Sequence, residues 1–169
     1  MIDIYKQCTL GQFEAALAML KQCIEHCPDD LWESTVAQLT VRQLAYHTLF
    51  FEDPYLTPHE DAFALRELHR TGGDERRPVS SPGLDQQATL DYLTTCLEKI
   101  RETLALEDEE TLRGPSGFSW CHFSRAELHL YNVRHVQHHT GQLSSHLRRL
   151  SQLPRPKRAS LGLHRLAPS

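Results

Sequence analysis

Apolar residues recur every three to four positions in four stretches of this chain, which is the spacing of helices that bury one face. The four predicted helices span about residues 5–26, 41–56, 86–106 and 124–150. The last is the clearest, and its predicted core seam is Ala126, Leu130, Val133, Val136, Leu143, Leu147 and Leu150. This pattern predicts an all-α fold.

Two of these helices begin at a capping box. Thr40 is followed three residues later by Gln43, and Ser124 by Glu127. In such a box each side chain accepts a hydrogen bond from the other residue's backbone amide. The boxes therefore predict where the second and fourth helices start.

A long connection, residues 57–84, separates the second and third helices and is rich in charge, glycine and proline. Adjacent antiparallel helices need only a few linking residues, so this length indicates a crossover between two parallel helices of a four-helix bundle. We assign residues 1–153 to this bundle domain and residues 154–169 to a basic tail. For the tail, a solvated end is favoured over an anionic partner.

Composition narrows the class of protein. No apolar run approaches the roughly 20 residues that span a bilayer, and the start of the chain lacks a signal-peptide pattern, so we expect a cytoplasmic protein without a membrane partner. A net charge of −4 argues against generic nucleic-acid binding. Five cysteines without a CxxC pair argue against a disulfide framework and a cysteine zinc site, and Cys23 and Cys27 are expected on a buried face.

Eleven histidines stand out, and three have inward positions. His135 and His139 are four residues apart on the fourth helix, so their side chains share one face, and His47 lies on the apolar stripe of the second helix. One such pair is expected by chance, and a single core histidine is usually structural, but three inward histidines on two helices favour a metal site. His138 falls one step round the helix and is not expected to join His135.

Other histidines are expected outside the site. His146 is interpreted as a polar or half-buried residue near the helix end. The histidines expected to be solvated are His59, His69, His122, His129 and His164.

The strings LAYHTLFFEDPYL and RHVQHHTGQLSSHLRRL resemble the DinB-like (DinB/YfiT) superfamily of bundle metalloproteins, over about residues 12–150. The resemblance implies an up-down-down-up four-helix bundle with His47, His135 and His139 as ligands of one divalent ion. It also implies a low-molecular-weight thiol as a second cofactor, a small-molecule substrate and a possible homodimer. Imidazole suits several metals, and we expect zinc or nickel.

Three neutral imidazoles leave the charge of the ion uncompensated and at least one position open, as in catalytic sites. Such an ion lowers the pKa of bound water or holds a thiol as thiolate. The leading hypothesis is a metal-dependent transferase that acts with a small thiol on an electrophile. The alternatives are a metal-dependent hydrolase and a non-enzymatic metal-binding or dimeric interaction protein. Because protons compete for imidazoles of pKa about 6.5, metal affinity is expected to fall between about pH 7 and 5.

Two further expectations concern the second helix. Glu52 either orients an imidazole through a hydrogen bond or has no part in the site. Tyr46 and Phe50 form a stripe offset from His47, which either contacts a second subunit or is covered by residues 57–84. The tryptophans are expected to be core or lid aromatics.

Overall fold

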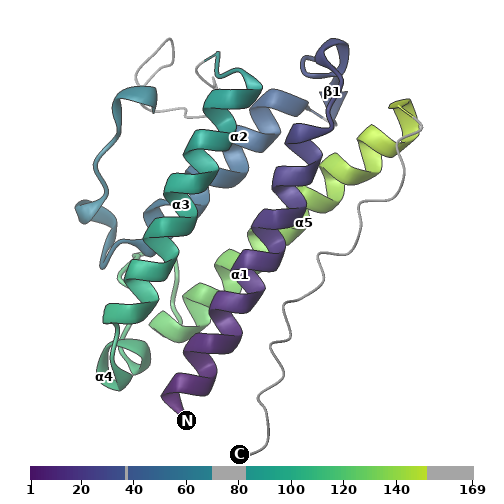
Figure 1. The fold of residues 1–169 in the computed structure, drawn as a ribbon. Coiled ribbons are helices and arrows are strands. Elements are labelled where there is room, and N and C mark those ends of the chain that lie inside the picture. The colour runs from purple at the N-terminus through teal and green to yellow at the C-terminus, as the bar shows by residue number, and fades with distance from the viewer. Residues whose placement is uncertain (37, 70–82, 152–169) are drawn as a thin grey trace, which may run out of the picture.

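The computed structural model describes residues 1–36, 38–69 and 83–151, and this part of the chain is mostly helical (Figure 1). The long helices are α1 (Ile2–Glu25), α2 (Val41–Glu52), α3 (Gln86–Leu106) and α5 (Arg125–Ser151), and the short α4 is Glu109–Arg113. Strands β1 (Thr35–Val36) and β2 (Leu39–Thr40) pair antiparallel before α2. The all-α class is therefore confirmed, with one small hairpin added.

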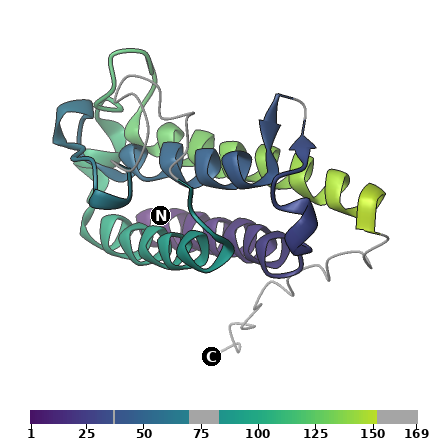
Figure 2. The same cartoon turned by 90° about the horizontal axis from the view of Figure 1, so that it is seen from above.

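Each long helix packs against two others. Helix α1 contacts α3 and α5, and α2 contacts the same two helices. In Figure 1, α1 and α5 rise from the bottom of the view while α2 and α3 descend. Figure 2 shows the resulting layers, with α2 beside α5 and α1 beside α3. The interface between α2 and α5 carries the predicted histidines.

Both predicted capping boxes are present. Thr40 Oγ1 accepts from the Gln43 amide at 3.2 Å, and Gln43 Oε1 accepts from the Thr40 amide at 2.9 Å. Ser124 and Glu127 make the same exchange, at 3.3 and 2.9 Å. Helix α2 ends at Glu52, earlier than predicted, because a proline two residues later cannot donate to the helix and restricts its neighbour.

The core seam of α5 differs from the prediction at two leucines. Leu130 and Leu150 are exposed, at 48% and 51%. The seam passes instead through His129, which is fully buried, and Leu130 lies about 100° further round the helix. Cys23 and Cys27 are buried as expected, and so is Trp32, whereas Trp120 is exposed.

The connection after α2 covers the stripe of Tyr46 and Phe50. The Phe50 ring lies 5.9 Å from that of Phe63 and 5.2 Å from that of His69. Tyr46 Oη lies 2.9 Å from His69 Nδ1, so His69 is half-buried rather than solvated. The stripe is therefore no free surface, and the covering alternative is the correct one.

A buried carboxylate anchors this connection to the helices. Asp53 is fully buried and accepts hydrogen bonds from Lys99, from Arg66 at 3.1 Å and from the Tyr92 hydroxyl at 3.1 Å. Burial by itself would raise the pKa of the Asp53 carboxyl, but the hydrogen bonds and charges of Lys99 and Arg66 hold it below its usual value. The network ties residues 53 and 66 to α3.

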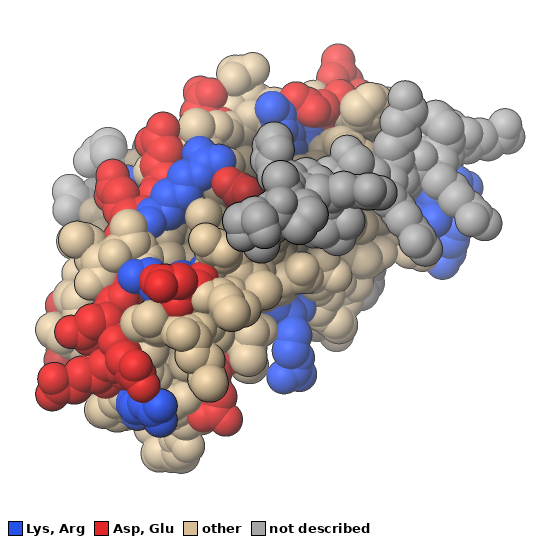
Figure 3. All heavy atoms as spheres, turned by 60° about the horizontal axis from the view of Figure 1, so that its bottom comes forward, with Lys and Arg blue, Asp and Glu red and all other residues tan. Residues whose placement is uncertain are grey.

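On the face drawn in Figure 3, acidic and basic side chains of the described residues lie interspersed. No helix in the described part of the chain is both long and apolar enough to cross a bilayer. The predicted tail, His164 and the middle of the predicted crossover, residues 70–82, lie outside the described residues.

Candidate metal centre

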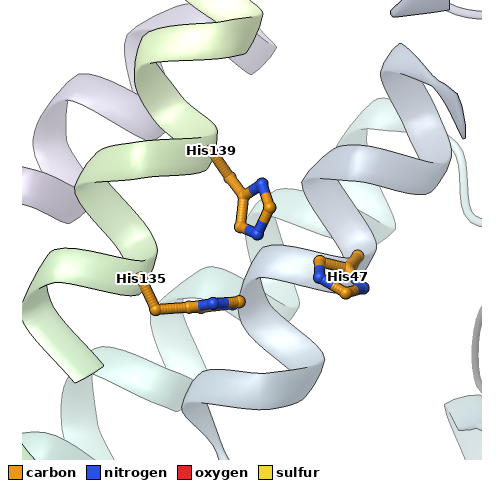
Figure 4. Close-up of side chains that lie close together, drawn as sticks. All are labelled: His47, His135 and His139. Carbon is orange, nitrogen blue, oxygen red and sulfur yellow. The ribbon is translucent and has the colours of Figure 1, made fainter. Parts of the chain in front are cut away.

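The three predicted histidines converge between two helices (Figure 4). Their ring centroids are 5.5 Å apart for His47 and His135, 4.8 Å for His47 and His139, and 4.6 Å for His135 and His139. One nitrogen of each ring lies within 4.8 Å of the others, close enough to share one ion. The sequence prediction thus places these side chains together correctly.

Local structure explains the convergence. The four-residue spacing on α5 stacks His135 and His139 on one face, and the packing of α2 on α5 brings His47 opposite them. The Phe51 ring lies 4.7 Å from that of His47 and 6.0 Å from that of His135, so it forms an apolar wall at one side. All three imidazoles are half-buried, which leaves another side open to solvent.

His139 is oriented by a neighbour that the sequence analysis did not single out. Its Nδ1 lies 2.8 Å from Gln142 Oε1, one helical turn further along α5. The amide oxygen can only accept, so Nδ1 carries the hydrogen and Nε2 keeps its lone pair for a metal. The sequence signal for this contact was the three-residue spacing of His139 and Gln142, which makes two side chains neighbours on the surface of a helix.

The imidazoles are held uncharged, as metal ligation requires. Burial, and then the neighbouring His139, lower the pKa of His47 to about 4. Burial and the surrounding histidines lower the pKa of His135 to about 3, and burial also lowers that of His139. His135 Nε2 is buried and has no hydrogen-bond partner, so a metal ion would satisfy it. The residues present therefore fit a divalent ion.

Two other histidines of α5 lie outside the group. His138 is exposed, and although its ring is 4.9 Å from that of His139, it cannot share the ion. His146 is half-buried, with Nε2 at 2.9 Å from Ser34 Oγ beside the hairpin. Both placements agree with the sequence analysis.

Glu52 does not orient an imidazole. Both of its carboxyl oxygens are buried and have no hydrogen-bond partner. Five residues correspond to about 140° round the helix, so Glu52 points into the core while His47 faces α5. Burial, followed by the charge of Asp53, raises the pKa of Glu52 well above its usual range.

His129 was expected to be solvated and is fully buried instead. Its Nε2 lies 2.6 Å from Glu107 Oε2, and Arg125 Nε donates to Glu107 Oε1 at 2.6 Å. The Arg125 guanidinium also donates to the backbone oxygens of Tyr55 and Thr57, at 3.0 and 2.8 Å. The hydrogen bond to Glu107, a carboxylate that Arg125 also holds, explains why a histidine is tolerated in the core.

Several buried polar atoms of α2 and α5 have no hydrogen-bond partner among the described residues. Seven such buried atoms occur in the described part of the chain, one of them on His69. The other six are Glu52 Oε1 and Oε2, His129 Nδ1, Asn132 Oδ1, His135 Nε2 and Thr140 Oγ1. Buried groups of this kind are normally paired with water, an ion or another polar group.

A hollow of about 560 Å³ lies against the outer side of α5 and β1. Its lining includes Gln142, which holds His139, together with Ser145, Arg149 and, from the hairpin, Val36. This volume is within the usual range for a small-molecule site. Arg149 gives it a permanent positive charge next to hydrogen-bonding groups.

No protein-family model matches this chain, and no curated protein or solved structure matches it. The resemblance to the DinB-like superfamily therefore rests on the two helix strings alone. The convergence of the histidines is a separate observation, because it concerns side-chain positions and not the order of letters.

Proposed function

We propose that the protein is a DinB-like metalloprotein, an up-down-down-up four-helix bundle that binds one divalent ion, zinc or nickel, on His47, His135 and His139. The observation that carries the proposal is the approach of one nitrogen from each ring to within 4.8 Å of the others. The directions of the four long helices and the pairing of α2 with α5 support the bundle. The free Nε2 of His135 supports the ion.

The reaction we propose is the transfer of a low-molecular-weight thiol to a small electrophile. When bound, the ion would supply a positive charge and an open position that favour the thiolate form of the thiol. Gln142 holds the His139 ring in place, and Phe51 excludes water from one side. Arg149 and Ser145 line the neighbouring hollow and suit an anionic or hydrogen-bonding end of the substrate.

Two observations rank the alternatives below this reaction. A hydrolase needs a carboxylate near the bound water, and no carboxylate of the described residues joins the three histidines. Glu52 points into the core and is not available to this water. A purely structural metal site is usually closed, whereas these three ligands are half-buried and leave the fourth position free.

The homodimer remains a proposal that rests on the resemblance alone. The stripe of Tyr46 and Phe50, which gave a reason for dimers in the residues themselves, is buried under Phe63 and His69. Sedimentation of the full chain at micromolar concentration measures the oligomeric state directly.

Elemental analysis of the purified full chain tests the metal site. The parent protein should contain about one equivalent of zinc or nickel, and His139→Ala should lose most of it. His138→Ala is the matched control, since its ring is adjacent but outside the group. The ligand assignment would be refuted if His139→Ala kept a full equivalent of metal while His138→Ala lost it.

Spectroscopy of the cobalt-substituted protein tests the thiol. Addition of L-cysteine should produce a thiolate-to-cobalt charge-transfer band, and Arg149→Gln should weaken L-cysteine binding more than that of ethanethiol, which lacks a carboxylate. If neither thiol produces a band while a model ester is hydrolysed, the hydrolase is the correct function.

A further inference from the structure

Buried polar side chains continue from His135 toward the start of α5, at steps of three residues. Asn132 and His129 are the next two, and each step is about 4.5 Å along the helix. Both are fully buried, and each keeps one atom without a hydrogen-bond partner, Asn132 Oδ1 and His129 Nδ1. This buried face of α5 is therefore polar, although the buried face of a helix is normally apolar.

Glu52 brings a carboxyl group from α2 to the same interior. Asn132 Nδ2 donates to the backbone oxygen of Glu52 at 3.1 Å, so the amide lies against the last turn of α2. The neighbouring groups give Glu52 no partner, because the Asp53 carboxylate is held by Lys99 and the Cys96 thiol contacts a backbone carbonyl. A carboxyl buried in this way is kept as the uncharged acid.

We propose that Glu52, Asn132 and His129 bind internal water in the core beside the last turn of α2, and that this water carries protons between Glu52 and Glu107. A buried water typically makes about three hydrogen bonds to groups that are otherwise unpaired. Here the carboxylic acid supplies a donor, and Asn132 Oδ1 and His129 Nδ1 supply acceptors. This path would supply or remove protons for the proposed metal centre, but the path itself requires no ion.

His129 connects this water to the end of the bundle. Its Nδ1 faces the interior unpaired, while Nε2 lies 2.6 Å from Glu107 Oε2. A proton leaves the Glu52 carboxyl, passes through water and binds His129 Nδ1, as Nε2 releases its own proton to Glu107 Oε2. The imidazole stays neutral, Glu52 becomes the carboxylate, and Glu107 becomes the acid until it returns the proton or releases it to solvent. Glu107 directly follows α3, and 9% of its side chain is exposed.

Infrared spectroscopy of the metal-free full chain tests this path. The parent protein at neutral pH should show a carbonyl band of a protonated carboxyl that is missing in Glu52→Gln. After a jump into D₂O, this band should shift rapidly in the parent and at least tenfold more slowly in His129→Gln. His138→Gln, at an exposed position of the same helix, should follow the parent.

Two results would overturn the proposal: no band that depends on Glu52, or equal exchange in His129→Gln and the parent. If His129→Gln does not fold, Glu107→Gln replaces it, because it blocks the same path at the next atom and should slow exchange equally. A failed metal site and a failed proton path are therefore told apart, since this measurement contains no metal.

Discussion

Gln142 Oε1 and His139 Nδ1 lie 2.8 Å apart, one turn from each other on α5. A hydrogen bond of this kind fixes which nitrogen faces a metal and typically contributes 10- to 100-fold to metal affinity. We therefore expect Gln142→Leu to bind zinc about 10- to 100-fold more weakly than the parent.

Competition with a chromophoric chelator measures this loss. Gln137→Leu, an exposed glutamine on the same helix, is the control and should bind like the parent. Equal affinities for the two variants would show that Gln142 does not position His139.

The structure moves the pH window in which the metal should be released. From the ordinary histidine pKa, we expected a loss between about pH 7 and 5. The pKa values of about 4 for His47 and about 3 for His135 are lowered, so protons compete for these nitrogens only at lower pH. Affinity should stay nearly constant from pH 7 to about 5 and fall steeply near pH 4 and below.

Metal titrations at half-unit pH steps, with a buffer that does not bind zinc, measure this window. A midpoint near pH 6.5 would show that the imidazoles titrate as in water. In that case, the burial seen at the centre does not control their protonation.

Glu52 should make the protein less stable at neutral pH than at acid pH. Its pKa is raised in the folded state, so its contribution to stability is complete below the unfolded value of about 4.3 and is lost as pH rises through the folded pKa. Glu52→Gln does not ionise and should be about 1–3 kcal/mol more stable than the parent at pH 7. Below about pH 4 the difference should disappear.

Urea denaturation at several pH values gives these free energies of unfolding. Glu98→Gln, at an exposed position of α3, is the matched control and should follow the parent. A Glu52→Gln variant that is less stable than the parent at pH 7 would show that the carboxylate has a partner in the folded protein.

Asp53→Asn should destabilise the fold without removing a metal ligand. The substitution leaves the ammonium of Lys99, which is mostly buried, without its counter-charge, and loss of one member of a buried pair costs about 3–5 kcal/mol. We expect about 2–4 kcal/mol here, because Arg66 is partly exposed and reaches solvent. Limited proteolysis should then cut the connection after α2 faster, whereas Asp91→Asn, at an exposed site, should change neither measurement.

The local elements and the three converging histidines could be predicted from the sequence because their signals lie within a few residues. The bounds of α3 agree with the prediction, and both capping boxes form. The spacing of His135 and His139 fixes their common face by helix geometry alone. The inward position of His47 could be predicted because this residue lies on the apolar stripe of the second helix.

The buried polar residues could not be predicted, because their partners lie far away in the sequence. Hydrophobic periodicity assigned the core position to Leu130, whereas the adjacent His129 occupies it and is paired with Glu107, 22 residues earlier. Asp53 is paired with Lys99 across 46 residues, whereas its neighbour Glu52, which has the same carboxyl group, has no partner. No local pattern distinguishes these two carboxylates.

The hydrogen bonds of Arg125 to the backbone oxygens of Tyr55 and Thr57 have a consequence for the proposed metal centre. They join the first turn of α5 to the chain just beyond α2, about 15 Å along the helix from His135. A slip of one residue between these two helices would shift His135 and His139 by about 1.5 Å relative to His47 and change the geometry of the group. Arg125 thus helps to fix the register of the two helices that carry the three histidines, although it lies far from them.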